Sequence, residues 1–254
     1  MKKLLLSVFG IACLVATPVQ ADELSSSWNG FYGGGHFGYG FGDATATGEV
    51  SGEVRCGFSC WEPFTLSRTG KFDLEGIFGG AQAGYNFQNG AFVFGLEADI
   101  SASDIKTSGD NALLDAGLVQ LGTVSASVDW FGTARGRVGY LLDDSVMVYA
   151  TGGLAFGDVT SSMGLTVACC DSVASKSDVQ VGYTVGGGVE AATSNNVSVK
   201  LEYLYVDLGS QDIFSQEIPT IGILTRNVTA CGRCDIAFHT VRVGVNWHFD
   251  TPLP

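Results

Sequence analysis

Apolar and polar residues alternate along most of this chain with a period of two. In the run AFVFGLEADI (91–100), every even-numbered position from 92 to 100 is apolar, whereas Glu97 and Asp99 lie on the other parity. This alternation is typical of a β-strand with one face in an apolar environment. It predicts eight strands, at 31–42, 76–87, 92–100, 127–141, 146–157, 179–191, 197–208 and 237–249.

The connections between these strands alternate between short and long. The joins at 88–91, 142–145 and 192–196 are tight and contain turn residues such as Asn-Gly and Asp-Asp. The stretches 43–75, 101–126, 158–178 and 209–236 are polar and are expected to form long loops, which are uncommon inside a compact soluble domain. The sequence therefore predicts an all-β fold: an eight-stranded antiparallel transmembrane β-barrel with short periplasmic turns and long extracellular loops.

Hydropathy supports a barrel and excludes a membrane-spanning helix in the mature chain. The mean hydropathy is +0.25, and charged residues make up 15% of the chain. Beyond the N-terminus there is no apolar run near 20 residues. The first residues, MKKLLLSVFGIACLVATPVQA, have the basic start, short apolar stretch and small-residue cleavage site of a secretory signal peptide. We expect residues 1–21 to be this signal peptide and residues 22–254 to be one outer-membrane barrel domain.

The charge balance limits the partners. The formal net charge is −13, which argues against nucleic acid because phosphates require Lys and Arg patches. The expected loops carry excess acid, which is usually a solvated surface. It could also bind the divalent cations that bridge lipopolysaccharide, or favour cations near a pore mouth.

The face opposite the apolar one carries charges of both signs among many glycines. An eight-stranded barrel is only just wide enough for its own side chains, so glycine would make room there for long charged chains. Counting from the short turns places Glu97, Arg135, Glu202 and Arg242 near one level, where opposite charges would pair because an unpaired interior charge costs several kcal/mol. The predicted lumen network is Glu97, Asp99, Arg135, Arg137, Glu190, Lys200, Glu202 and Arg242.

Six cysteines follow the expected signal peptide, and an exported chain with an even number of cysteines favours disulfides. The disulfide candidates are Cys56, Cys60, Cys169, Cys170, Cys231 and Cys234. Local pairs, Cys56–Cys60 and Cys231–Cys234, are the first expectation. An adjacent Cys169–Cys170 bond would be strained, so cross-loop pairs stay open. Zinc is the weaker alternative for the Cys-x-x-Cys spacing, and we expect no metal and no cofactor.

The run WNGFYGGGHFGYGFG (28–42) resembles the first strand of small outer-membrane β-barrel proteins of alphaproteobacteria. GLEADI, VDWFGTARGRVGYL, YATGGLAFG, VGYTVGGGVEAA, VKLEYLYVDLG and HTVRVGVNWHF are similar to its later strands, in order. The resemblance implies an OmpA-like eight-stranded barrel of a Gram-negative outer membrane, with a structural or immunogenic surface role. Some relatives are described as porins, and some bind heme. Family barrels usually end on an aromatic residue that the assembly machinery reads, whereas here five residues follow Phe249.

Three functions follow as hypotheses. The first is a structural, surface-exposed barrel whose lumen is plugged by charges, with outer-membrane lipid, lipopolysaccharide and the barrel assembly machinery as partners. The second is a narrow porin-like channel for ions or small solutes. The third is binding of an extracellular ligand or host partner through the loops; heme is the named case, and His239 with its aromatic neighbours would suit it. No Ser/His/Asp set is evident, so we expect no enzyme.

Overall fold

The structure is a computed structural model that describes residues 28–56, 60–107, 112–115, 119–167, 170–194, 196–218 and 225–249. The predicted signal peptide, residues 1–21, lies outside the described residues. The strands are β1 (Gly30–Arg55), β2 (Trp61–Asn89), β3 (Phe92–Thr107), β4 (Ala112–Asp115), β5 (Val119–Leu141), β6 (Val146–Val167), β7 (Cys170–Ser194), β8 (Val197–Ile218) and β9 (Thr225–His248). The described part of the chain has no helix long and apolar enough to cross a membrane.

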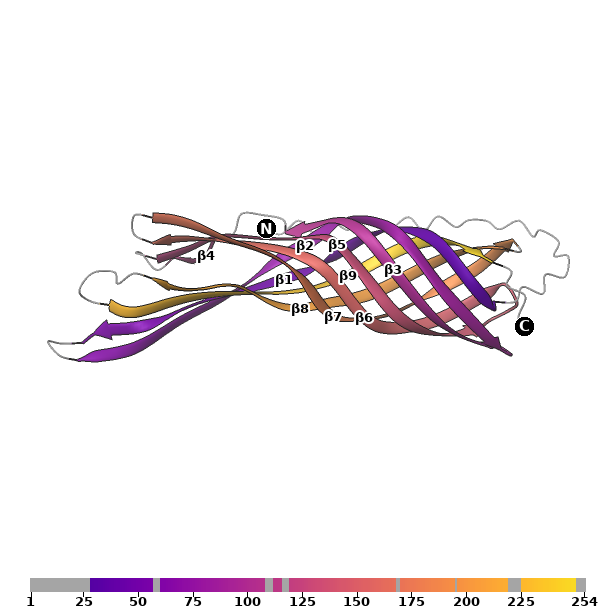
Figure 1. Cartoon of the computed structure of the whole chain (residues 1–254), viewed down its shortest axis with the longest axis horizontal. Coiled ribbons are helices and arrows are strands. Elements are labelled where there is room, and N and C mark those ends of the chain that lie inside the picture. The colour runs from indigo at the N-terminus through magenta and orange to yellow at the C-terminus, as the bar shows by residue number, and fades with distance from the viewer. Residues whose placement is uncertain are drawn as a thin grey trace, which may run out of the picture.

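Eight of these strands close into a ring. Neighbours pair in the order β3-β2-β1-β9-β8-β7-β6-β5, and an additional pairing of β3 with β5 closes the barrel. All of these pairs are antiparallel. Figure 1 shows the tilted strands of the closed ring on the right. The predicted eight-stranded antiparallel barrel is confirmed; the four-residue strand β4, which among the described residues pairs with β5 alone, is an addition outside the ring.

The prediction of four long loops is wrong for most of their length. The stretch 43–75, for example, is largely strand, because β1 continues to Arg55 and β2 begins at Trp61. The reason is that the period-two pattern continues through these polar stretches with small or well-separated apolar residues. Ala44, Ala46 and Phe72 are buried, whereas the intervening side chains are polar. Serine, threonine and glycine in the outer positions made the segment look like a loop.

Beyond the ring the strands separate into two four-stranded sheets, which we call the extension. Pairing of β2 with β3 ends at Leu74–Thr107, and pairing of β7 with β8 ends at Tyr183–Asp207. One sheet is therefore β2-β1-β9-β8, and the other is β4-β5-β6-β7. The two groups of strands are visible on the left of Figure 1. A single apolar cluster with residues from both sheets, among them Ile236 and Val159, fills the space between them.

The outside of the ring is an apolar belt. Leu96 and Val181, for example, expose 71% and 67% of their surfaces. Aromatic residues border the belt at both ends. Phe31 and Phe41 mark the two borders on β1 and lie ten residues apart. A strand that rises about 3.4 Å per residue and tilts about 45° covers roughly 24 Å over that length, which matches the apolar band of outer-membrane barrels.

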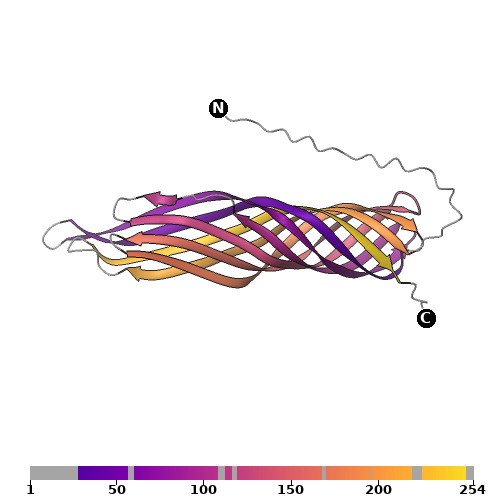
Figure 2. The ribbon, with the colours of Figure 1, turned by 90° about the horizontal axis from the view of Figure 1, so that it is seen from above.

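The short turns lie at the end of the barrel away from the extension (Figure 2). In the β5–β6 turn, Oδ1 of Asp143 accepts bonds from the backbone N–H groups of Ser145 and Val146, both at 2.8 Å. The Ser145 hydroxyl donates to the same oxygen at 2.8 Å. These bonds favour the carboxylate and lower the pKa of Asp143. The Asp-Asp-Ser sequence therefore closes this turn through a side chain that replaces a backbone acceptor.

Candidate functional site in the barrel interior

The end of the interior near the short turns is closed by an apolar layer. Trp28 precedes β1 and is 2% exposed, and it clusters with Val93, Met147 and Tyr149. The backbone N–H of Trp28 donates to Oε1 of Gln88 at 2.9 Å. Its indole N–H donates to the carbonyl of Asp144 at 3.3 Å. The residues before the first strand thus place the Trp28 side chain inside the barrel, at the end near the short turns.

Glu97 is the centre of the charged layer above. It lies opposite Arg135 across β3 and β5 and is hydrogen-bonded to that guanidinium. The Lys200 ammonium donates to both carboxylate oxygens of Glu97 at 2.8 Å. The Tyr32 hydroxyl donates to Oε2 at 2.7 Å. Such charge-assisted bonds, several to one carboxylate, hold the side chain in one position.

Arg242 joins two further carboxylates in the same layer. Its Nε donates to Oε2 of Glu202 at 2.5 Å, and its Nη2 donates to Oδ2 of Asp99 at 3.2 Å. Nη1 of Arg135 donates to Oε1 of Glu202 at 3.1 Å. The hydroxyl of Tyr149 donates to the same oxygen at 2.9 Å. The two arginines therefore share their acceptors and form one connected network.

Arg137 and Glu190 lie nearer the short turns. Nη1 of Arg137 donates to Oε2 of Glu190 at 2.9 Å. The guanidinium also lies over the ring of Tyr32, 4.8 Å from its centroid. Oε1 of Glu190 accepts from the hydroxyl of Ser198 at 2.6 Å and from the amide of Asn246 at 2.7 Å. Every polar contact of this pair is made inside the barrel.

The structure therefore brings together all eight residues of the predicted lumen network. None exposes more than 5% of its surface. The set contains four carboxylates and four cations, so its formal charge is zero. Glu97, Arg135, Glu202 and Arg242, which are predicted near one level, are joined to one another, whereas Arg137 and Glu190 form a second level, with Arg137 3.6 Å from Glu97. A neutral, enclosed network has no net charge to attract ions of one sign.

Sequence reasoning missed the apolar layer above the charges. Phe78, Phe131 and Phe238 meet in edge-to-face contacts, with ring centroids 5.2 and 5.4 Å apart. Leu204, Val206 and Ile105 belong to the same buried cluster. A signal was available, because Phe78 and Phe238 share the parity of the polar residues that face the lumen on their strands, Gln82 and Arg242. The prediction instead placed parts of this layer in loops.

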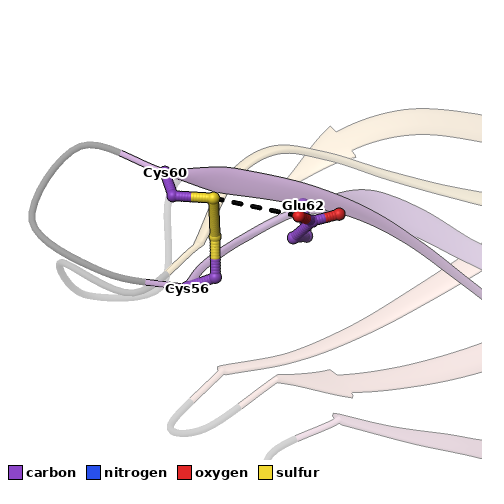
Figure 3. Close-up of a disulfide and its surroundings, with 3 residues drawn as sticks. All are labelled: Cys56, Cys60 and Glu62. Carbon is purple, nitrogen blue, oxygen red and sulfur yellow. Dashed lines mark hydrogen bonds between the residues drawn. A yellow bond between two sulfur atoms is a disulfide. The ribbon is translucent and has the colours of Figure 1, made fainter.

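Cys56 and Cys60 are joined by a disulfide at the tip of the β1–β2 hairpin (Figure 3). The expected Cys231–Cys234 bond is wrong. Both residues lie within β9 and three positions apart, so they point to opposite faces and their Cα atoms are about 10 Å apart, too far for a disulfide. Cys169 lies outside the described residues, and the side chain of Cys170 is not described.

One cluster has the composition of a metal site. Cys56, Cys60 and Glu62 place potential ligand atoms within 4.8 Å of one another. The disulfide occupies both sulfurs, however, and a zinc ligand must be a thiolate. In this oxidised state the two cysteines crosslink the β1–β2 hairpin.

The three histidines lie in different environments. His36 is buried in the lumen, where it contacts Gln82 at 3.0 Å and Ser101 at 2.7 Å. His248 lies in the lumen near the short turns, 2.8 Å from the Ser198 hydroxyl. His239 faces outward at the border of the apolar belt, stacked on Phe41 and Tyr203. Heme binding at His239 stays a prediction.

Comparison with known proteins agrees with this architecture. Residues 9–249 match the family model of the outer membrane protein beta-barrel domain. The chain is 33% identical to a 31 kDa outer-membrane immunogenic protein of Brucella melitensis, covering 92% of this chain and 89% of that protein. It is 37% identical to a 22 kDa outer membrane protein of Rhizobium leguminosarum, over 60% of this chain and 66% of that protein. Among solved structures it is similar to OprG of Pseudomonas aeruginosa, with 14% identity, a TM-score of 0.45, and coverage of 90% of this chain and 100% of that one.

Proposed function

Since the chain belongs to the outer membrane protein beta-barrel family, we propose that it functions as a closed structural barrel that holds its extension outside the cell. The protein is located in the outer membrane, as its relatives are. The short turns face the periplasm. In this function the barrel is an anchor, and the surface of the extension makes the contacts with the surroundings.

One observation carries the proposal: the lumen is filled by three consecutive layers. The layer around Trp28 lies at the periplasmic end, the neutral charge network lies in the middle, and the layer around Phe131 lies below the extension. An ion that crossed the barrel would have to displace both apolar layers and compete with arginine for buried carboxylates. Either step costs several kcal/mol. This arrangement favours the closed barrel over the narrow channel.

The test is single-channel recording of the refolded mature protein in a planar lipid bilayer. We expect no discrete conductance steps in the wild-type protein. The Arg135→Ala variant supplies the matched control, because it removes the cation that Glu97, Asp99 and Glu202 share. Circular dichroism of each sample must show β-structure, so that a silent bilayer reflects a closed barrel and not an unfolded one.

Discrete, salt-dependent steps in the wild-type protein that grow in Arg135→Ala would contradict the proposal. They would mean that the charge network lines a pore, and the porin-like channel would then be the better account. Steps in the variant alone would support the proposal, because they would show that the network is what closes the lumen.

The proposal includes three partners of the barrel itself. The apolar belt and its aromatic borders suit outer-membrane lipid, with lipopolysaccharide at the border next to the extension. The barrel assembly machinery is the third partner, and Phe249 would be the aromatic residue that it reads. Phe249 is 52% exposed, and its N–H donates to the carbonyl of Phe31 at 2.8 Å. This hydrogen bond extends the pairing between the last strand, β9, and the first strand, β1, to Phe249.

A further inference from the structure

Strand β2 forms one of the long sheet edges of the extension that have no partner strand among the described residues. Within the described residues, β2 pairs with β1 from Trp61 onward, but its pairing with β3 begins at Leu74. The segment from Glu62 to Asp73 is therefore the edge of a four-stranded sheet. An open edge presents a row of backbone donors and acceptors that only another extended chain can satisfy together.

The direction of these groups follows from two hydrogen bonds. The N–H of Cys56 donates to the carbonyl of Cys60 at 3.1 Å, so the even-numbered pairs of β1 and β2 carry their mutual bonds. The carbonyl of Phe31, an odd-numbered residue of β1, accepts from Phe249 on the β9 side. The β1–β2 register is continuous from Gly30 to Arg55. Odd-numbered residues of β2 therefore direct their N–H and C=O groups toward the open edge.

Pro63 agrees with this assignment. A proline in a β-strand is tolerated where its nitrogen faces away from the neighbouring strand. Pro63 is odd-numbered, so its nitrogen lies on the open side. On the open side Pro63 offers a carbonyl but no N–H, whereas Thr65, Ser67 and Thr69 offer both groups.

The other seam of the extension, between β7 and β8, is protected. There the pairing of β8 with β9 is interrupted by register shifts between Asp207 and Ser210 and between Asp212 and Phe214. Gly209 has a positive φ of 76°. The ammonium of Lys176 on β7 crosses to the backbone carbonyl of Asp212 at 3.2 Å. Bulges, lysines and prolines are the usual devices that block strand addition. On the β2 edge these are Pro63 and Lys71, and the stretch between them from Thr65 to Thr69 has none.

We propose that the β2 edge binds the β2 edge of a second copy of this chain, in an antiparallel pair centred on Thr65. In this register Glu62 faces Arg68 of the second copy, and Phe64 faces Leu66. The two-fold symmetry repeats both contacts. These even-numbered pairs are the non-hydrogen-bonded ones, whose side chains approach most closely.

Charge and exposure support this register. Glu62 and Arg68 are both exposed, and neither forms an ion pair within the described chain. They are six residues apart on one strand, about 20 Å, so they cannot pair with each other in one copy. Leu66 exposes 49% of its surface. The disulfide beside Glu62 fixes the tip of the hairpin that presents the edge (Figure 3).

The geometry also fixes how the two barrels are oriented. The strands of the extension run along the long axis of the molecule (Figure 2). An antiparallel pair of β2 edges therefore points the two barrels in opposite directions. Two copies in one membrane point the same way and cannot pair like this. The contact joins copies in two facing membranes, so the protein acts as a homotypic adhesion element between cells.

The experiment uses the mature protein in lipid nanodiscs that hold one barrel each. Sedimentation velocity measures association, and negative-stain electron microscopy shows its geometry. We expect pairs of discs joined through their extensions, with the discs at opposite ends. Glu62→Arg or Arg68→Glu alone should weaken association by about tenfold or more, because each places like charges opposite each other twice. The double exchange Glu62→Arg/Arg68→Glu should restore it.

Ser67 faces Pro63 of the second copy, so its N–H is the only backbone donor of that residue pair. Ser67→Pro removes this donor without touching the bonds to β1 and should abolish the pairs, whereas Ser67→Ala should not. Equal circular dichroism spectra exclude misfolding as the cause. The proposal is overturned if the wild-type protein stays in single discs at all concentrations, or if discs associate side by side. Pairs that persist in Ser67→Pro, or that ignore the charge exchange, overturn it as well.

Discussion

Glu202 and Arg242 face each other across β8 and β9, and the guanidinium donates to the carboxylate at 2.5 Å inside the barrel. Each residue is 1% exposed. The first prediction concerns this pair. Arg242→Met removes the cation but leaves Glu202 and Asp99 buried with fewer partners, so we expect a loss of about 3–5 kcal/mol in the free energy of unfolding. Urea unfolding in lipid vesicles, followed by tryptophan fluorescence, measures it.

The matched control is an exposed pair on the extension. Arg233 and Asp212 are 2.8 Å apart, with side chains 58% and 70% exposed. Solvent screens such a pair, so Arg233→Met should cost less than about 1 kcal/mol. Equal losses in the two variants would show that the interior network does not contribute more than a surface ion pair.

The second prediction compares two glycines. Gly80 lies where a Cβ atom would collide with the backbone carbonyl of Ile100 on the neighbouring strand, whereas a Cβ at Gly136 would meet no atom within 4 Å. Gly80→Ala should therefore destabilise the barrel by about 1–3 kcal/mol, since backbone cannot move aside cheaply. Gly136→Ala should be neutral or slightly stabilising. The same urea experiment ranks the two variants, and the opposite ranking would refute the role of glycine in close strand approach.

The sequence could predict the barrel and the inward direction of its charged side chains, because successive side chains of a β-strand point to opposite faces. Once Phe92 and Leu96 are assigned to the lipid side, Glu97 and Asp99 must point inward. Counting from the turns also places Arg135 near the level of Glu97, and the strand register pairs these two residues. The counting covered only Glu97, Arg135, Glu202 and Arg242. Arg137 and Glu190 are closer in sequence to the short turns, and for that reason they lie at a separate level.

The extension could not be predicted because its chemistry resembles a loop. Between Asp43 and Gly48 the sequence is built from aspartate, alanine, threonine and glycine. Alanine is small enough to be buried between two sheets without forming a visible hydrophobic run. The expected Cys231–Cys234 bond failed for the same reason: a loop would allow it, but a strand separates the two side chains.

The third prediction concerns Cys234. Its side chain is fully buried in the extension, and burial raises the pKa of the thiol to about 11. Because the thiolate is the reactive form, the folded protein should not be alkylated at Cys234 at pH 8. Reactivity should appear only as the pH approaches 11 or after denaturation. Iodoacetamide labelling with peptide mass spectrometry measures it, and rapid labelling of the folded protein at pH 8 would contradict the buried position.

The fourth prediction tests which surface faces lipid. Trp28 and Trp247 lie near the same end of the barrel, but Trp28 is 2% exposed inside it, whereas Trp247 is 55% exposed on the apolar belt. Variants with one tryptophan each, the others replaced by phenylalanine, are reconstituted in vesicles of brominated lipid. Bromine quenches indole fluorescence only at short range, so Trp247 should be strongly quenched and Trp28 should not. Comparable quenching of both residues would mean that Trp28 does not close the periplasmic end, and the closed-barrel proposal would lose one of its two apolar layers.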